Sequence, residues 1–126
     1  MTNAELVRRL WHAIDTRDWV ACASFCAVDL TYALPQSGES HKRGNYLRLN
    51  REYPGDWRVS IDHLVDGGDW IVTEVTVTFP DHRDRGVSLF RCENALIAEI
   101  REYWPEPFPV PEWRKQWNLE EETNSE

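Results

Sequence analysis

The chain is short of basic residues and of long apolar runs, and each shortage argues against a class of protein. Its 126 residues carry 14 Lys and Arg against 22 Asp and Glu, a formal net charge of −8. Nucleic acids and anionic membranes are bound through clustered Lys and Arg, so we expect neither as a partner. No basic segment followed by an apolar run opens the chain, and no apolar run could cross a bilayer. We therefore expect no signal peptide and no membrane span.

Cysteine is also scarce, which disfavours a disulfide framework or a zinc site. Cys22, Cys26 and Cys92 are an odd set, and none has a histidine at ligand-like spacing. Cys22 and Cys26 lie one helical turn apart and could hold a metal or oxidise. Packing is the simpler explanation, because no other Cys or His is near them in the sequence. We expect reduced, buried thiols in a cytoplasmic protein, with no metal ion and no cofactor.

Tryptophan, in contrast, is abundant, with seven in the chain. Its large apolar ring and single N–H suit cores, pockets and interfaces alike. The length allows one domain with a substantial core and leaves no room for a second. We assign this domain to residues 1–118, and we expect the acidic, polar residues 119–126 to be disordered.

The first half of the chain has mostly helical periodicity. Apolar side chains recur at helical spacing in three stretches, which predicts helices over 4–16, 19–26 and 45–53. Asn3 and Asp18 are the expected N-caps of the first two, and His12 falls on the solvent side of the first. Between the second and third helices we predict a strand over 30–34, followed by a loop over 36–43.

The second half alternates with period two, which indicates an antiparallel meander. Strands are predicted over the ranges 57–65, 70–79, 86–92 and 96–104. Beyond them, alternating prolines over 105–111 predict an extended path, and 112–118 reads as a short helical segment. The fold class is therefore α+β, with three N-terminal helices packed on a strongly bent mixed or antiparallel sheet.

This order of elements, with several loose motifs, resembles the NTF2-like cone fold and its SnoaL-like branch. The residues that carry the resemblance are Leu6-Val7-x-x-Leu10, Asp15-x-x-Asp18-Trp19, Arg43-Gly44 before a helix, Asp66-Gly67-Gly68-Asp69-Trp70-Ile71-Val72, Phe90-Arg91-Cys92, Ile97-x-x-Ile100-Arg101-Glu102-Tyr103-Trp104 and the ending Pro111-Glu112-Trp113-Arg114-x-x-Trp117. The match spans nearly the whole chain, and the order of the elements is stronger than any single motif.

The resemblance implies a sheet bent around the helices with a conical cavity between them, and a homodimer formed through the outer sheet face. Members of the branch include isomerases, cyclases, hydrolases and dehydratases as well as ligand binders, so the fold does not decide the function. Steroid isomerases of this fold use a carboxylate base, a tyrosine and a protonated acid. The matching positions here fall at Leu34, at or near Leu10, and at or near Ser88, which disfavours that chemistry.

Alternation along the strands predicts which side chains face the cavity. The predicted cavity face consists of Tyr32, Leu34, Val72, Glu74, Thr76, Ser88, Phe90, Cys92, Ile100, Glu102 and Trp104. Such a mostly apolar face with few polar groups is typical of a small-molecule pocket. Glu74 and Glu102 are its only carboxylates, and two carboxylates in a dry pocket form a candidate acid–base pair. The alternative is a structural role, with Arg58 or Arg91 neutralising one of them, or Ser and Thr hydroxyls satisfying them.

The other candidates are open to more than one interpretation. His63 is expected to face the sheet interior, and a register error of one residue would bring Asp62 into the pocket in its place. Tyr46 and Tyr53 on the third helix could donate hydrogen bonds to a ligand or simply fill the core. We expect Trp104 to be a wall of the pocket. Trp113 and Trp117 could close the cone or contact a second subunit.

Three functions remain compatible with the sequence. The first is a homodimeric protein that binds a small hydrophobic organic molecule in the cone. The second is an enzyme that moves a proton in such a molecule, using Glu74 and Glu102. The third is a non-catalytic dimerisation or interaction module whose cone is filled by Trp side chains. A pocket that holds both carboxylates, one with a raised pKa, would favour the enzyme.

Overall fold

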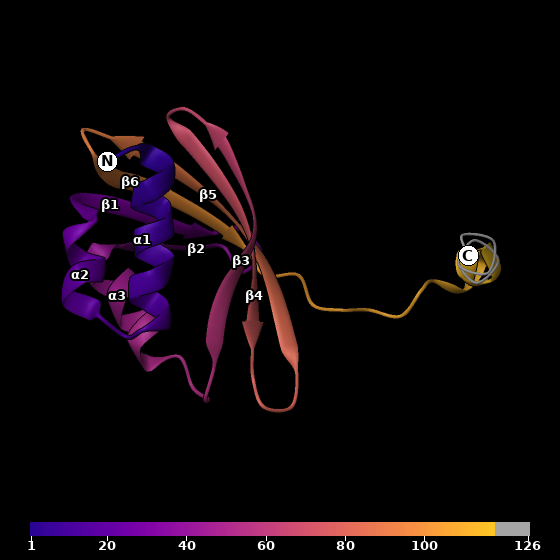
Figure 1. Cartoon of the computed structure of the whole chain (residues 1–126). Helices are drawn as coiled ribbons and strands as arrows, with labels where there is room; N and C mark the ends of the chain where they lie inside the picture. The colour runs from indigo at the N-terminus through magenta and orange to yellow at the C-terminus, as the bar shows by residue number, and fades with distance from the viewer. Residues whose placement is uncertain (118–126) are drawn as a thin grey trace.

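In the computed structural model, which describes residues 1–117, three helices lie on one face of a six-stranded sheet (Figure 1). The helices are α1 (Asn3–Asp15), α2 (Trp19–Ser24) and α3 (Arg43–Glu52), with a 3-10 turn η1 (Glu112–Arg114) near the end. The strands are β1 (Cys26–Leu34), β2 (Glu39–Lys42), β3 (Arg58–Gly67), β4 (Trp70–Thr78), β5 (Arg83–Glu93) and β6 (Leu96–Tyr103).

The sheet is mixed, which confirms the predicted α+β class. Its strand order is β2-β1-β6-β5-β4-β3. The β1–β6 pair is parallel and every other neighbouring pair is antiparallel. The chain thus enters the sheet at β1, leaves for α3, and returns as the predicted meander from β3 to β6. The three helices cover the inner face, and among residues 1–117 no helix lies over the opposite, outer face of β3 to β6 (Figure 1).

The N-terminus of α1 differs from the prediction by one residue. Thr2, not Asn3, is the N-cap, and its hydroxyl accepts a hydrogen bond from the backbone N–H of Glu5 at 3.1 Å. Asn3 instead donates from Nδ2 to the carbonyl of Gly68 at 2.9 Å. Thr and Asn are both good N-cap residues, but the Asn3 side chain bonds to the turn between β3 and β4 and so does not cap the helix. Asp18 caps α2 as predicted, accepting from the N–H of Ala21 at 3.1 Å.

The core lies between α1 and the inner face of the sheet. Its most deeply buried apolar side chains are Val7, Leu10, Ile14, Cys22, Leu30, Tyr46, Ile71, Val75, Phe90, Ile97 and Ile100. Burying a Val, Leu, Ile or Phe side chain contributes about 1.5–3 kcal/mol, so this layer is the main source of stability. The three cysteines are free and buried, and burial raises the pKa of the Cys22 and Cys26 thiols to about 12.

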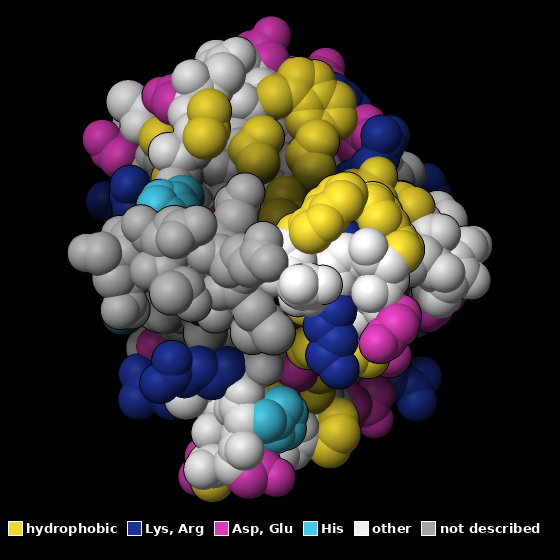
Figure 2. Space-filling model, turned by 90° about the vertical axis from the view of Figure 1, so that its right-hand side faces the viewer, with side chains coloured by type: hydrophobic (Ala, Val, Ile, Leu, Met, Phe, Trp, Pro, Cys, Tyr) yellow, Lys and Arg dark blue, Asp and Glu magenta, His cyan; other side chains and the backbone are white. Residues whose placement is uncertain are grey.

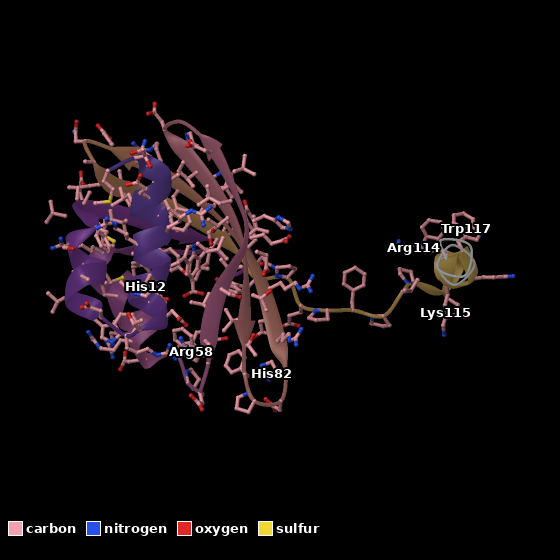
Figure 3. The ribbon with its side chains drawn as sticks, viewed as in Figure 1. His12, Arg58, His82, Arg114, Lys115 and Trp117 are labelled. Carbon is pink, nitrogen blue, oxygen red and sulfur yellow. The ribbon has the colours of Figure 1, made fainter. Side chains whose placement is uncertain are left out.

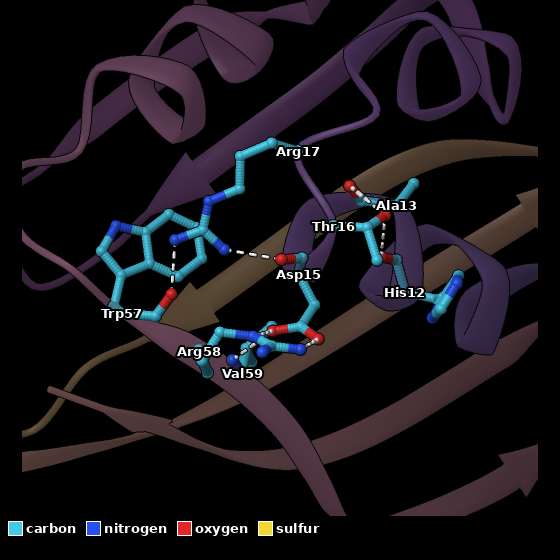
Figure 4. A network of polar contacts seen from close by, with 8 residues as sticks. All are labelled: His12, Ala13, Asp15, Thr16, Arg17, Trp57, Arg58 and Val59. Atoms are coloured by element: carbon cyan, nitrogen blue, oxygen red, sulfur yellow. Dashed lines mark hydrogen bonds and ion pairs between the residues drawn. The ribbon is translucent and has the colours of Figure 1, made fainter.

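A polar network ties the end of α1 to the start of β3 (Figure 4). The Asp15 carboxylate accepts from the Arg58 guanidinium at 2.8 and 3.0 Å, and from the backbone N–H of Val59 at 2.8 Å. Arg17 lies over the Trp57 ring, 3.7 Å from its centroid, and donates to the Trp57 carbonyl. The Arg58 hydrogen bond holds the pKa of Asp15 below its ordinary value. Arg58 therefore pairs with Asp15, and it does not neutralise Glu74 or Glu102, as one alternative from the sequence proposed.

Two segments near β1 were predicted incorrectly. The predicted strand over 30–34 begins earlier, at Cys26, because α2 ends at Ser24 and not at 26. The predicted loop over 36–43 contains β2, whose Ser40 and His41 pair with Ala33 and Tyr32 of β1. Strand β2 is polar and mostly exposed, so it has no apolar alternation to reveal it. Its pairing with β1 makes it a strand.

The predicted inward face of β4 is wrong: Val72, Glu74 and Thr76 were all expected in the cavity and all lie on the outer face. On β4 the buried set is Ile71, Thr73, Val75 and Val77, so Glu74 faces outward. Burying the β-branched set and leaving the carboxylate in water is the lower free-energy choice. In β3 the register shifts between Ile61 and His63, a bulge that leaves both Asp62 and His63 on the exposed side.

After β6 the chain leaves the body as an extended segment. Residues 105–111 run away from the outer side of the sheet and end near η1 (Figure 1). The extended path agrees with the alternating prolines. The predicted helix end at residue 118 and the predicted tail over 119–126 lie outside the described residues. Across residues 1–117, we find no helix of the length and apolarity that a bilayer crossing needs.

Candidate functional site

The candidate site is built around Glu102, which lies on the inner face of β6. Strand β6 runs between β1 and β5, so its inner face receives side chains from both neighbours. Ser88 of β5 is directly opposite Glu102 in the strand register. Only 4% of Glu102 is exposed, and with Thr73 and Ser88 it makes up the buried polar residues of the described chain. An acid in this position needs hydrogen-bond donors.

Three side chains donate hydrogen bonds to the Glu102 carboxylate. The Tyr32 hydroxyl reaches Oε1 at 2.7 Å, and the Ser88 hydroxyl reaches Oε2 at 2.9 Å. The Trp104 indole N–H donates to Oε1 at 3.1 Å. A carboxylate accepts such bonds more strongly than a neutral oxygen does. The alternative expected from the sequence, hydroxyls that satisfy the acid, is therefore present at Glu102.

The pKa of Glu102 lies above its ordinary value. Burial is the largest cause and raises it, while the hydrogen bonds from Tyr32, Ser88 and Trp104 lower it in part. Burial and the nearby Glu102 charge also raise the pKa of Tyr32, so its hydroxyl stays protonated and acts as a donor. The arrangement can hold a proton on Glu102, or release it, closer to neutral pH than a solvated carboxyl can.

A second tyrosine hydroxyl lies beside this network without a partner. The Tyr46 ring of α3 packs edge-on to Tyr32 with centroids 4.7 Å apart, and 1% of Tyr46 is exposed. Within residues 1–117 its hydroxyl is the one buried side-chain polar atom with no hydrogen-bond partner. Burial raises its pKa well above the ordinary value. An unpaired buried hydroxyl costs about 1–3 kcal/mol.

Trp104 lines two hollows, and Glu102 lines only the first of them. The open hollow, about 470 Å³, lies at the ends of β1 and β6. It is lined by Leu34, Gln36, Ser37, Glu102, Trp104 and Glu106. The enclosed hollow is about 30 Å³. It is lined by Trp11, Ile14, Asn50, Tyr53, Trp57, Val59, Val77 and Trp104. The Trp104 indole is thus a wall common to both.

Two contacts hold Trp104 in this place. Its backbone N–H donates to the side-chain oxygen of Gln36 at 2.6 Å. Its ring lies against Gly86 of β5, where an added Cβ would come within 2.5 Å of a ring carbon. Glycine at this position therefore leaves the space that the indole fills, and the local sequence gives no other reason for a glycine inside a strand.

The structure separates the predicted site residues into two groups. Tyr32, Ser88 and Trp104 bond to Glu102, and Leu34 lines the open hollow. The remaining inner residues are placed as follows: Phe90 packs edge-on to Trp11, Tyr46 lies beside Tyr32, and Tyr53 is half exposed at the enclosed hollow.

Glu74, Asp62 and His63 form the second group and lie on the outer face. Here the prediction of a Glu74–Glu102 pair in one pocket is wrong. Glu74 lies 3.8 Å from His63 Nε2, and Asp62 accepts from the Thr76 hydroxyl at 2.5 Å. These residues line a polar hollow of about 430 Å³ on the outer sheet face, which the sheet separates from Glu102.

Sequence reasoning missed four residues of the site. Gln36 and Ser37 lie in the predicted loop and Glu106 in the predicted extended segment, yet all three line the open hollow. Gly86 is predicted only as the start of a strand. A glycine opposite a tryptophan in a predicted β pairing could have indicated the close approach. Among residues 1–117, no three His, Cys, Asp or Glu side chains are grouped as a metal site.

Comparisons with known proteins agree on one family. The sequence model of the SnoaL-like domain matches residues 7–100. A crystal structure of a candidate ketosteroid isomerase from Kribbella flavida DSM 17836 is 32% identical, with a TM-score of 0.84, over 90% of this chain and 84% of that chain. An NTF2-like protein of unknown function from Burkholderia xenovorans LB400 is 26% identical, with a TM-score of 0.76, over 90% of each chain.

A candidate polyketide cyclase from Xanthomonas campestris pv. campestris has the same fold. It is 21% identical, with a TM-score of 0.65, over 80% of this chain and 88% of that chain, and at this identity the likeness shows the fold alone. No curated protein matches the chain. The family match and the Kribbella structure, together with the bent sheet and its inner acid, lead to one conclusion: the chain belongs to the SnoaL-like family of the NTF2-like superfamily.

Proposed function

We propose that this protein binds a small, largely apolar organic molecule whose one polar end, a carbonyl or hydroxyl oxygen, is held at Glu102. The observation that carries the proposal is the position of Glu102 as a buried acid on the inner face, next to an open hollow. Protonated Glu102 can donate to a carbonyl, and ionised Glu102 can accept from a hydroxyl. In the open hollow, Leu34 and the Trp104 ring offer apolar contact, and Gln36, Ser37, Glu102 and Glu106 offer hydrogen-bonding groups.

The volumes indicate how a ligand would enter. The open hollow, about 470 Å³, falls in the range of small-molecule pockets, roughly 300–1,000 Å³. The enclosed hollow, about 30 Å³, holds no more than one water molecule or so. In the proposed binding mode, the Trp104 ring turns away and enlarges this space for the apolar part of the ligand. A ligand oxygen could then take over the hydrogen bond that Trp104 gives up at Glu102.

Matched probes test this proposal. Cyclohexanone, cyclohexanol and methylenecyclohexane have the same ring, but only the first two have the oxygen. We expect thermal-shift and calorimetric measurements to show saturable binding of the oxygen-bearing probes, and weaker binding of methylenecyclohexane. Glu102→Leu, which removes both donor and acceptor, should reduce the preference for oxygen, and Trp104→Ala should tighten binding of larger ring ketones such as 2-decalone. Equal binding of all three probes, or no binding by either the native chain or the Trp104→Ala variant, would contradict the proposal.

A second candidate function is proton transfer next to a carbonyl, with Glu102 alone as the acid–base group. The raised pKa of Glu102 favours it, and so do the Tyr32 and Ser88 hydroxyls, which hold the carboxyl group in one orientation. The test is exchange of the α-hydrogens of cyclohexanone in deuterated water, followed by NMR. Protein-dependent exchange that Glu102→Gln abolishes would support catalysis. Binding without exchange would leave ligand binding as the function.

We also propose that the protein forms a homodimer through the outer sheet face. This proposal rests on the apolar strip of that face, defined as Val65, Trp70, Val72, Val87 and Leu89. Val65 is 61% exposed and Trp70 36% exposed. Exposed apolar patches of this kind commonly mark interaction sites. Sedimentation velocity over a range of protein concentrations measures the dimer directly.

A further inference from the structure

We infer that residues 105–117, called the arm from here on, pack on a second copy of the chain, so that two copies exchange arms. This goes beyond the proposed outer-face dimer, because it assigns a function to a segment that lies away from the body of its own copy. The arm leaves the sheet on its outer side, opposite the helices (Figure 1). Arg114, Lys115 and Trp117 lie at its far end, away from every strand (Figure 3).

The arm carries apolar side chains that its own copy does not cover. Phe108 is 73% exposed, Trp113 69% and Trp117 58%. The two tryptophans pack on each other edge-on, with ring centroids 5.4 Å apart, and Arg114 lies over Trp113. Aromatic side chains bury roughly 150–250 Å² each. Weighted by their exposed fractions, the three rings can supply about 300–500 Å², roughly half of one partner's share of a standard interface.

The path of the arm disfavours folding back on its own copy. Prolines at 105, 107, 109 and 111 hold it extended, and each also restricts the residue before it to extended conformations. There is no glycine from 105 to 117 to reverse the direction. A polyproline path rises about 3.1 Å per residue, so seven residues reach about 22 Å, beyond the spacing of about 10 Å between two facing sheets.

The surface that the arm meets lies on the same face of another copy. Hydrophobic side chains gather in the upper part of this face (Figure 2). Val65, Val72 and Leu89 of the apolar strip are side by side in the strand register. Tyr103, the last residue of β6, pairs with Val87 of the strip, so the arm begins at its edge. One chain thus carries both an exposed apolar arm and an exposed apolar strip, as a self-complementary twofold contact requires.

Four variants of the full chain separate an exchanged arm from other arrangements. The arm variant is W113A/W117A and the strip variant is Val65→Lys. Matched controls are Lys115→Ala on the arm and Val20→Lys on α2. Val20 is 85% exposed and lies on the helix side of the molecule. The native chain should dimerise in sedimentation velocity. The arm and strip variants should each raise the dimer Kd at least about 30-fold, the loss of about 2 kcal/mol typical of a hot spot. The controls should match the native chain.

Mixing the two defective variants gives the decisive result. A heterodimer of the two retains one intact arm on one intact strip, whereas each variant alone retains none. We expect the mixture to dimerise more tightly than either variant alone, with thermal unfolding verifying that both are folded. If the mixture is no tighter, the arm does not act on another copy. If W113A/W117A leaves the dimer unchanged, the dimer rests on the sheet faces alone. A native chain that stays monomeric overturns both the arm exchange and the dimer, while the Glu102 site is unaffected.

Discussion

The substitution Tyr32→Phe tests the hydrogen bond that most directly supports Glu102. It keeps the buried ring and removes only the hydroxyl, which donates to Oε1 at 2.7 Å inside the protein. A hydrogen bond contributes about 0.5–1.5 kcal/mol, and about 1.5–3 kcal/mol where its acceptor is charged, so we expect the free energy of unfolding to fall by about 0.5–3 kcal/mol. Urea unfolding followed by circular dichroism measures it, with an unchanged m-value as evidence that the same surface unfolds.

A matched control comes from the neighbouring ring. Tyr46→Phe removes a hydroxyl that has no partner within residues 1–117, so we expect the free energy of unfolding to stay the same or to rise by up to about 3 kcal/mol. Tyr32→Phe should also raise the pKa of Glu102 further, because a donor to the charged form is lost. The reasoning is refuted if Tyr46→Phe costs as much as Tyr32→Phe, or if Tyr32→Phe costs less than about 0.5 kcal/mol, the lower end for a hydrogen bond.

Three further predictions concern pH and packing. The folded-state pKa of Glu102 is raised, so its stabilisation is complete below the unfolded value of about 4.3 and is lost as pH rises through the folded value. Glu102→Gln should remove this dependence from urea unfolding curves. The folded-state pKa of Asp15 is lowered, so its stabilisation is present above about 3.9 and is lost as pH falls through the folded value. Asp15→Asn should cost about 1–3 kcal/mol at pH 7 and little at the acid end. Gly86→Ala should displace Trp104 and cost about 1–3 kcal/mol with a change in tryptophan fluorescence. The control Gly44→Ala, where nothing lies within 4 Å of the added Cβ, should be neutral or stabilising.

The fold followed from the sequence because its signals are local and repeated. Period-two alternation located the meander, and Asp66-Gly67-Gly68-Asp69 located its first turn, between β3 and β4. Strand β2 was not predicted, because its four residues are polar and form a strand only by pairing with β1. Long-range pairing of this kind leaves no periodic pattern in a single sequence.

The site could be predicted from the sequence only in part, because its membership depends on which face of the sheet each side chain points to. Glu102 was placed correctly by its apolar neighbours on β6, and Ser88 by the alternation on β5. The facing of Glu74 was predicted incorrectly because both alternating sets on β4 contain β-branched side chains, and the buried set is Ile71, Thr73, Val75 and Val77. Asp62 and His63 depended on a bulge, and a single extra residue in β3 reverses every later side chain.

The most direct test of the account follows the Glu102 carboxyl carbon and the Trp104 indole N–H by NMR while cyclohexanone is added. The account predicts that both signals shift along the same saturable curve, because the ligand oxygen enters the hydrogen bond that these two groups share. Before addition, the carboxyl signal should titrate above the ordinary glutamate pKa. Saturable binding that leaves both signals unmoved, or a Glu102 pKa at or below the ordinary value, would contradict it.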